Sequence, residues 1–415
     1  LLSLALLLVS IEAIARPITH EDVWLMPRVG SPVLSPDGRY AVVSVMQPAY
    51  ERAEQSSDLW LISLAETNTP PRQITFSKGG ESQVIWSPDS SAIAFRAKRN
   101  GDDAAQIYLL SLNRGGEARR LTNHPNGAGE ATFSPDGKRL AFVSQVNPHA
   151  VGAESAKELE GVNVRTYTGF PIRNWNRWLD GKEPRLFVQD LDSDEAVDVI
   201  GESDLVAQPG FAGSRSSSGA RLNPVWTPDG ESIIFSASDN RHRYAFDFTD
   251  QDLWMVSASG GEPQRLTGDR DLAGSDSYSS HTFTPDGQYL VASRTPRTDR
   301  VYNGSSLVIW SWPEATKVNE IEMPDRRSVG GFVVPSNDRV YILGQDASQI
   351  KIYEADLVND AVTSLSFNFE SGMYSGLQAV SVGDEIKIIG SWQAAHQPAE
   401  VVAIDLATGT HEQLT

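Results

Sequence analysis

The sequence predicts an all-β protein, a seven-bladed β-propeller of four-stranded blades with a short N-terminal helix. The first observation is a turn, Ser-Pro-Asp-Gly, that recurs along the chain. The second is that each copy is followed by short apolar segments with the length and alternation of strands. Repeats with periods of about twenty to fifty residues are typical of solenoids, propellers and arrays. The copies and near copies of the turn begin at Ser35, Ser87, Ser134, Thr227 and Thr284.

The residue types of the turn have separate roles. Proline presets the φ angle of the second position of a type I turn, Asp suits the third, and Gly adopts the left-handed conformation that lets the next strand leave in register. Each turn therefore joins two strands of a hairpin. The strands that follow the turns are residues 40–43, 92–95, 140–143, 233–235 and 289–291.

A third and a fourth strand complete each unit. The fourth strand ends in most units with Arg or Gln, then Leu or Ile, then Thr, as in Arg265-Leu266-Thr267 and Gln413-Leu414-Thr415. Four strands per repeat are typical of a propeller blade. The expected third strands are 59–64, 107–112, 186–191, 253–256, 307–310, 350–353 and 401–404.

One unit is longer than the others. Successive turn prolines lie 52, 47, 93 and 57 residues apart, and Pro335 of a degenerate turn follows after another 50. The interval of 93 residues contains one third-strand and one fourth-strand segment, the latter at 196–200, so we interpret it as one blade with an insertion at about 147–184. A last unit without the proline runs from Ser381 to Thr415.

The composition excludes several classes of function. The net charge is −19, with 35 Lys and Arg against 54 Asp and Glu. Because the sequence also has no local run of basic residues, nucleic-acid binding is not expected. There is no cysteine, which excludes disulfides, thiolate zinc sites and cysteine nucleophiles. The seven histidines are scattered, and none forms the i, i+4 pair of a helical metal site. We therefore predict no metal and no cofactor.

The first fifteen residues have the pattern of a signal peptide. An apolar run from Leu1 to Ile11 is followed by Ala13-Ile14-Ala15, a small-x-small cleavage pattern. The run is too short to span a bilayer. We predict export to the periplasm or the extracellular space, a mature chain that starts at or near Arg16, and no membrane span after cleavage. A buried N-terminal helix is the alternative.

Residues 16–28 are expected to form a strap ahead of the propeller, which would occupy residues 29–415. Thr19 and Asp22 have the spacing of a capping box, and the apolar turn that follows stops at Pro27. The expected role of this short helix is to cover the rim of the propeller.

Two stretches carry a resemblance to a known family. They are the segment from Thr19 to Gly38, with its Thr-x-Glu-Asp-Val-Trp helix and first turn, and the segment Arg173-Asn-Trp-Asn-Arg-Trp-Leu-Asp-Gly181. The order of these stretches resembles the N-terminal half of exported bacterial peptidases of the prolyl oligopeptidase family, in the dipeptidyl aminopeptidase and acylaminoacyl peptidase branch. Asn174 and Asn176 stand where that family has His and Asp, which puts any charge-dependent role there in doubt.

The resemblance implies a second domain. In this family a C-terminal α/β-hydrolase domain supplies Ser, Asp and His, with the Ser on a Gly-x-Ser-x-Gly elbow. The sequence contains no Gly-x-Ser-x-Gly and ends at Thr415, where that domain would begin. We therefore expect no catalytic residue in these 415 residues and no peptidase activity from them alone. The implied partners are a peptide substrate and the hydrolase domain of the same polypeptide.

The implied role of the propeller is to gate the access of oligopeptides to a serine exopeptidase that releases dipeptides or acylated residues. Long loops that break a repeat are often functional, so the candidate substrate-binding residues are Arg173, Trp175, Glu158 and Glu160. The carboxylates would bind a free peptide N-terminus, and Arg173 a peptide carbonyl or carboxylate. The alternatives are that the Glu residues form a solvated face and that Trp175 and Trp178 pack the insertion onto the blades.

A second function from a different class remains open. The TolB translocation protein uses similar Ser-Pro-Asp-Gly repeats in a propeller that docks other proteins in the periplasm without chemistry. A TolB-like propeller has six blades and a separate α/β domain ahead of them, whereas here only about a dozen residues separate the expected signal peptide from the first blade.

Overall fold

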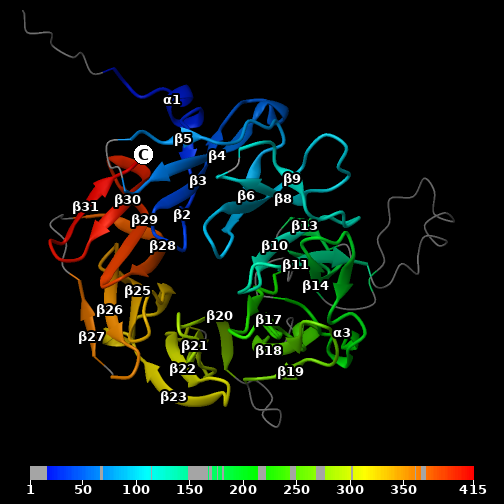
Figure 1. The fold of residues 1–415 in the computed structure, drawn as a ribbon. Helices are drawn as coiled ribbons and strands as arrows, with labels where there is room; N and C mark the ends of the chain where they lie inside the picture. Colours follow the sequence, from blue (N-terminus) through cyan, green and yellow to red (C-terminus); the bar gives the residue numbers. More distant parts are fainter. Residues whose placement is uncertain are drawn as a thin grey trace, which may run out of the picture.

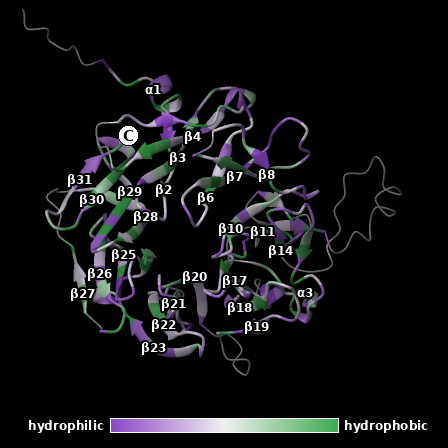
Figure 2. Cartoon of the chain, viewed as in Figure 1, coloured by the Kyte–Doolittle hydropathy of each residue, from purple (hydrophilic) through white to green (hydrophobic). Residues whose placement is uncertain are grey.

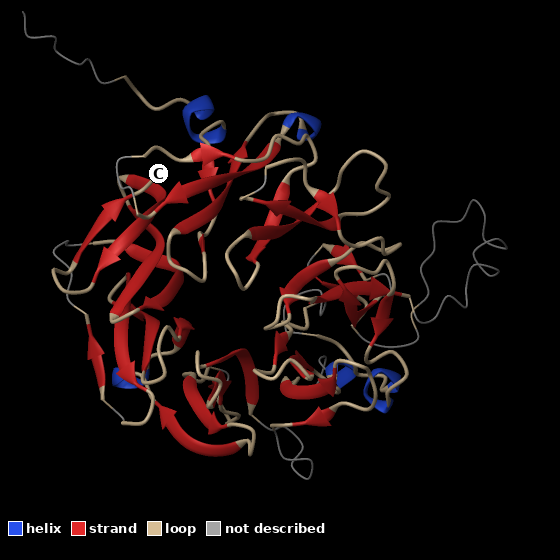
Figure 3. Ribbon diagram, viewed as in Figure 1, coloured by secondary structure: helices blue, strands red, loops and turns tan. Residues whose placement is uncertain are grey.

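The structure is a computed structural model. It describes residues 16–65, 69–113, 115–147, 167, 171–174, 176–179, 182–213, 221–243, 249–267, 276–300, 302–359, 361–365 and 371–415. Strands dominate these residues and are arranged in a ring about a common axis (Figures 1 and 3). In the described part of the chain, no helix is both long enough and apolar enough to cross a membrane.

The first sheets follow the repeat. The first pairs β1 (Arg28–Val29), β3 (Tyr40–Gln47), β4 (Ser56–Ser63) and β5 (Arg72–Gln73), and β2 (Val33–Leu34) pairs with β3. The second contains β6 (Glu81–Trp86), β7 (Ala92–Ala97), β8 (Gln106–Ser111) and β9 (Arg119–Arg120). The third contains β10 (Gly129–Phe133), β11 (Arg139–Val146), β14 (Glu183–Asp190) and β15 (Ala196–Asp198).

The remaining sheets continue around the ring. One contains β16 (Val225–Trp226), β17 (Ser232–Ala237), β18 (Asp252–Ser257) and β19 (Gln264–Arg265), and the next contains β20 (Ser277–Phe283), β21 (Tyr289–Thr295), β22 (Ser306–Ser311) and β23 (Thr316–Ile321). The last sheet has eight strands: β24 (Val329–Val333), β25 (Arg339–Asp346), β26 (Gln349–Asp356), β27 (Val362–Ser364), β28 (Met373–Val382), β29 (Glu385–Ala394), β30 (Gln397–Asp405) and β31 (Thr410–Gln413).

The all-β propeller of four-stranded antiparallel sheets is confirmed. The number of seven blades stays a prediction, because the last two expected units lie in one sheet, joined by a parallel pair between Ile350 and Met373. The helical elements are short: α1 (His20–Trp24), α3 (Asp204–Ala207) and the 3-10 turns Arg52–Glu54, Arg241–Arg243 and Pro324–Arg326.

The hydrophobic core lies between neighbouring sheets, and hydrophobic residues concentrate along the strands (Figure 2). The ends of the ring meet through such a cluster, in which Leu34 and Ile62 of the first sheet pack with Ile389 and Val401 of the last. Among the described residues, no strand of the first sheet pairs with a strand of the last. The ring is therefore closed by side-chain packing.

The antiparallel order gives the ring two distinct faces. The Ser-Pro-Asp-Gly turns join the first strand of each unit to the second, so they all lie on one face, which we call the turn face. The connection from the second strand to the third and the end of the fourth strand lie at the opposite ends of the strands. We call that side the insertion face, because it holds the β11–β14 connection, where the insertion was expected.

Hydrogen bonds within the turn explain its first residue. The Ser35 hydroxyl donates to Asp37 at 2.6 Å and accepts from the Tyr40 amide at 3.0 Å, while Asp37 accepts from the Arg39 amide at 3.0 Å. The same hydroxyl-to-carboxylate bond recurs at Ser87, Ser134, Thr227 and Thr284. It is the largest cause that lowers the pKa of Asp89, Asp136 and Asp229.

Neighbouring turns pack together around the turn face. Gly230 and Gly287 have φ angles of +73° and +72°, a conformation that an L side chain rarely adopts. A Cβ atom at Gly287 would lie 2.6 Å from the Pro228 side chain of the preceding turn, whereas at Gly230 the nearest atoms, including Pro135, are 3.5 Å away. Both positions therefore favour glycine because of the positive φ angle, and Gly287 also because a Cβ atom would clash with Pro228.

The two glycines form a matched pair for a stability test. We expect Gly230→Ala to cost about 1–2 kcal/mol for the left-handed backbone, and Gly287→Ala to cost about 3 kcal/mol, because overpacking adds to the same strain. Urea unfolding of both variants measures the difference. Equal losses would show that the contact with Pro228 relaxes without cost.

Candidate functional site

The candidate site is the β11–β14 connection on the insertion face. Its described part contains a two-stranded sheet, β12 (Arg173–Asn174) and β13 (Arg177–Trp178), in which Arg173 is opposite Trp178. Tyr167 supports this hairpin, since its hydroxyl donates to the Leu179 carbonyl at 2.9 Å and its ring lies 6.3 Å from that of Trp178. The insertion therefore contains ordered structure of its own.

The hairpin presents a cation and an aromatic ring to solvent. Arg173 is exposed, and 53% of Trp178 is exposed, so packing on the blades does not account for this Trp. An exposed guanidinium beside exposed aromatic surface can bind carbonyl or carboxylate groups. The other candidate residues, Glu158, Glu160 and Trp175, lie outside the described residues, and their roles stay predictions.

A buried arginine stands where the insertion rejoins the third sheet. Arg185 of β14 is 4% exposed, and its guanidinium lies 3.1 Å from Glu183, 3.9 Å from Asp198 and 5.5 Å from the ring centre of Phe211. Burial raises the pKa of Asp198, and Arg185 opposes that effect. Sequence reasoning missed this cluster, because its members come from two strands and a following loop.

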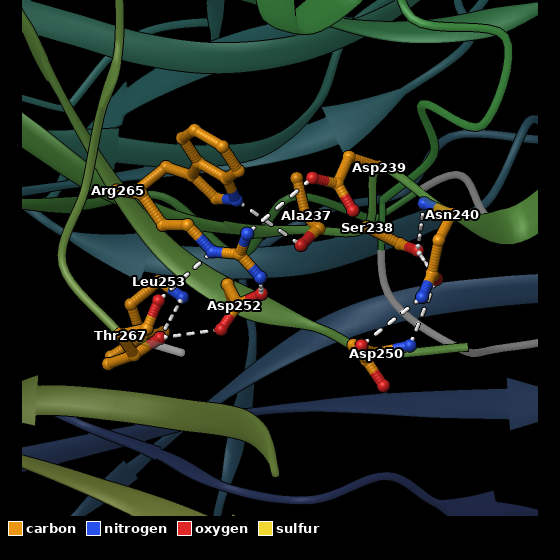
Figure 4. Close-up of polar contacts among 10 residues, drawn as sticks. Ala237, Ser238, Asp239, Asn240, Asp250, Asp252, Leu253, Arg265 and Thr267 are labelled. Carbon is orange, nitrogen blue, oxygen red and sulfur yellow. Dashed lines mark hydrogen bonds and ion pairs between the residues drawn. The ribbon is translucent and has the colours of Figure 1, made fainter. Parts of the chain in front are cut away.

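The sheet that follows has a polar network on the same face (Figure 4). Asn240 links the two ends of the β17–β18 connection: its carbonyl oxygen accepts from Ser238 at 3.1 Å and from the Asp250 amide at 3.0 Å, and its amide donates to Asp250 at 3.2 Å. The network thus fixes both ends of this connection.

Arg265 ties the same connection to the outer strand. It forms an ion pair with the buried Asp252, lies 3.6 Å from Asp239, and donates to the Thr267 carbonyl at 3.0 Å. Thr267 in turn donates to Asp252 at 3.0 Å. Burial raises the pKa of Asp252 to about 6, against the effect of Arg265. The sequence predicted that Arg265-Leu266-Thr267 ends a strand, but it did not predict the ion pair of Arg265 with Asp252.

The hydrogen bonds of Thr267 recur at the ends of other units, which indicates that they have a structural role. Thr267 accepts from the Leu253 amide at 2.9 Å, and the Thr that ends other units accepts from the equivalent amide of the third strand. Each of these threonines also donates to an acidic or amide side chain nearby. The other members are Thr75 with Leu59 and Glu81, Thr122 with Ile107 and Gln106, and Thr415 with Val401 and Glu400.

Two arrangements that support catalysis in other proteins, a metal site and a Ser–His pair, can be checked among the described residues. These residues hold no group of three metal-binding side chains. Ser144 and His124 approach to 2.7 Å, but Ser144 is only 3% exposed and its hydroxyl donates to the Gly127 carbonyl at 2.6 Å. A nucleophile needs a free path to substrate and a base that takes its proton, so this pair is structural.

Comparison with known proteins agrees with the propeller fold. The family model described as a TolB beta propeller domain matches residues 20–168. Dipeptidyl-peptidase 5 of Porphyromonas endodontalis is 21% identical over 399 residues, which are 96% of this chain and 55% of that protein. The chain is a β-propeller domain that resembles part of dipeptidyl-peptidase 5.

Solved structures show the same propeller fold. The acylaminoacyl peptidase of Pyrococcus horikoshii superposes with a TM-score of 0.65 at 17% identity, over 95% of this chain and 53% of that one. The β-propeller domain of the trilobed protease from Pyrococcus furiosus superposes with a TM-score of 0.60 at 13% identity, over 94% and 98%. The chain thus spans about half the length of the peptidases and nearly all of an isolated propeller domain.

Proposed function

We propose that this propeller controls the access of oligopeptides to a serine exopeptidase of the prolyl oligopeptidase family, which releases dipeptides or acylated residues. The observation that carries the proposal is the match to dipeptidyl-peptidase 5 over 96% of this chain but only 55% of that protein. The catalytic Ser, Asp and His would lie in polypeptide that follows Thr415. The 415 residues alone would be inactive.

The direction of the strands supports this arrangement. Thr415 lies two residues beyond the fourth strand of its unit, β31 (Thr410–Gln413), and its hydroxyl accepts from the Val401 amide in the middle of the third strand, β30 (Gln397–Asp405). Because β31 runs toward the first residues of β30, which begin on the insertion face, Thr415 lies on that side. Polypeptide that continues from Thr415 would start on the face that holds the hairpin of Arg173 and Trp178. A domain seated there would receive substrates past the insertion, and a closed ring above it would exclude large folded proteins and bulk water.

Arg173 gives a kinetic test of the insertion. In the full-length enzyme we expect Arg173→Ala to lower kcat/KM for peptide substrates by about tenfold, because it removes one charge-assisted hydrogen bond. Arg119 of β9, which is also exposed, provides the control Arg119→Ala. Unchanged kinetics in Arg173→Ala, with the same unfolding midpoint, would exclude a substrate contact at this residue.

A non-catalytic docking platform of the TolB kind is the second candidate. The description of the family model that matches residues 20–168 favours it. The reading frame after Thr415 discriminates between the two functions. An extension of about 250 residues with Gly-x-Ser-x-Gly would support the peptidase, and a stop codon at that point would favour the platform.

A further inference from the structure

An arginine without a carboxylate partner lies where the second and third sheets meet on the insertion face. Arg96 of β7 is half-buried, and its Nε atom donates to the Ala128 carbonyl at 3.0 Å. In the described part of the chain, no carboxylate pairs with Arg96, and burial lowers its pKa. Because a charged group that leaves water is normally paired, this guanidinium indicates a place for an anion.

Arg96 differs in this respect from other arginines at the same end of the sheets. The chain has 54 Asp and Glu against 35 Lys and Arg, so carboxylates are abundant and a shortage of them does not explain the unpaired guanidinium. The arginines that form ion pairs on the insertion face include Arg99 with Glu81, Arg185 with Glu183, Arg265 with Asp252, Arg294 with Asp276 and Arg327 with Asp346.

Gln83 of β6 adds a second donor beside Arg96. Ser82 lies opposite Arg96 in the pairing of β6 with β7, and the next residue, Gln83, has a φ angle of +52° in a β-bulge. Its Oε1 atom accepts from the Glu130 amide of β10 at 3.0 Å, which leaves its Nε2 group to donate. Left-handed backbone at a residue other than glycine costs free energy, and such strain is concentrated at functional sites.

Gly129 at the start of β10 lets the two side chains approach the same point. A Cβ atom on Gly129 would lie 3.0 Å from Gln83 Oε1 and 3.6 Å from Arg96 Nε. The carboxylate of Glu130 is engaged elsewhere, since it accepts from the Asn223 amide of the next sheet at 2.9 Å. The unused groups of Arg96 and Gln83 are therefore N–H donors, and a planar guanidinium fits the two oxygens of a carboxylate.

These residues lie on the inner side of the ring. Strands β6 and β10 are the first strands of their sheets and face the centre of the ring in Figure 1. Arg96 is near the end of β7 and Gly129 is at the start of β10, so both are on the insertion face. Thr415 lies on that face as well, so a substrate of a domain that follows it would come within reach of this donor pair.

We infer that Arg96 and Gln83 bind the C-terminal carboxylate of an oligopeptide substrate. This inference rests on the proposed function, in which residues are released from the N-terminal end of the peptide while its C-terminal end extends toward the ring. The site would favour short peptides with a free C-terminus over internal segments of long chains. An Asp or Glu side chain of the peptide carries the same chemical group, and the experiment separates these two sources.

Peptide binding by the 415-residue chain tests the site without any catalytic step. Isothermal titration calorimetry would compare pentaalanine with a free C-terminus, its C-terminal amide, and that amide with a central Glu. We expect the acid to bind at least about tenfold more tightly than the amide, because only the acid forms a charge-assisted pair. The amide with a central Glu should bind like the plain amide. Arg96→Met should weaken binding of the acid about tenfold and remove the difference.

Arg139 of β11 provides a matched control on the turn face. It is also half-buried, and its Nη2 atom donates to a carbonyl of the next sheet, that of Gly230, at 2.6 Å. Arg139→Met should leave the preference for the acid unchanged. Arg96→Lys keeps the charge but not the planar donors, so it should retain part of the preference. The unfolding midpoint of each variant shows whether it is folded.

The outcomes separate this inference from the proposed function. Equal binding of the acid and the amide, or binding of neither, would overturn the carboxylate site even if the longer protein is an active peptidase. A preference for the acid that survives in folded Arg96→Met would overturn it too. An amide with a central Glu that binds as tightly as the acid would overturn the assignment to the C-terminus. A preference lost in Arg96→Met, in a chain whose full reading frame yields no peptidase, would support the site and overturn the proposed function.

Discussion

Replacing Arg265 by Met is expected to destabilise the propeller by about 3 kcal/mol, because it leaves a buried carboxylate without its cation. Asp252 is 2% exposed, and the remaining hydroxyl of Thr267 supplies a hydrogen bond but no charge. Removal of Arg265 also removes the interaction that opposes the burial effect on the pKa of Asp252. The free energy of unfolding in urea at pH 7 measures the loss.

Two further variants show whether burial of the charge is the cause. Asp252→Asn combined with Arg265→Met should recover part of the loss, since the charge is then gone. Arg339→Met breaks an ion pair with Glu354 in which the arginine side chain is 47% exposed, and it should cost less than about 1 kcal/mol. Similar losses for Arg265→Met and Arg339→Met would contradict this explanation.

The stability of the protein is expected to fall by up to roughly 3 kcal/mol between pH 6.5 and pH 4 because of one residue, His281 of β20. This side chain is 6% exposed, and its Nε2 atom lies 3.2 Å from the Ile234 carbonyl. Burial lowers the pKa of His281 to about 4. Below pH 6.5 the unfolded chain binds a proton at this residue that the folded chain does not, so stability is present above pH 6.5 and is lost as the pH falls.

The readout is the slope of unfolding free energy against pH, because carboxylates contribute their own slopes. His281→Gln keeps a donor for the Ile234 carbonyl but cannot titrate. Between pH 6.5 and pH 4 its unfolding should therefore take up about one proton fewer, and the slope of its unfolding free energy against pH should be smaller by that amount. His20→Gln changes an exposed histidine and serves as the control. A slope in His281→Gln equal to that of the unmodified chain would show that His281 accepts a proton in the folded state.

The recurring turn allowed most of the architecture to be predicted. Ser, Pro, Asp and Gly specify a tight turn through local interactions alone, so each copy of the four residues predicts a hairpin. The role of the first residue of the turn was not predicted. The Ser35 hydroxyl donates a hydrogen bond to Asp37 and accepts one from the Tyr40 amide, and these groups come within reach only once the turn has formed. Long-range pairing was also invisible, as in the parallel pair of Ile350 and Met373 that joins two expected units.

The candidate site was predictable only in outline. The broken period predicted an insertion at about 147–184, and Arg173 became a candidate because it lies in that insertion. The anchor at Arg185 was missed, because Asp198 approaches it only when β14 and β15 pair. In the alternative interpretation, Trp178 was expected to pack the insertion onto the blades, but 53% of this side chain is exposed, so such packing does not account for it. Which face holds the insertion follows from strand direction rather than from any motif.

The most direct test of the central claim is peptidase activity measured side by side. The 415-residue protein and the product of its full reading frame would be assayed with chromogenic dipeptide and acyl-amino acid substrates. We expect hydrolysis only by the longer product, abolished by a serine-directed phosphonate. Hydrolysis by the 415-residue protein that the phosphonate abolishes, or an inactive longer product, would contradict the proposal that the propeller serves catalytic residues located after Thr415.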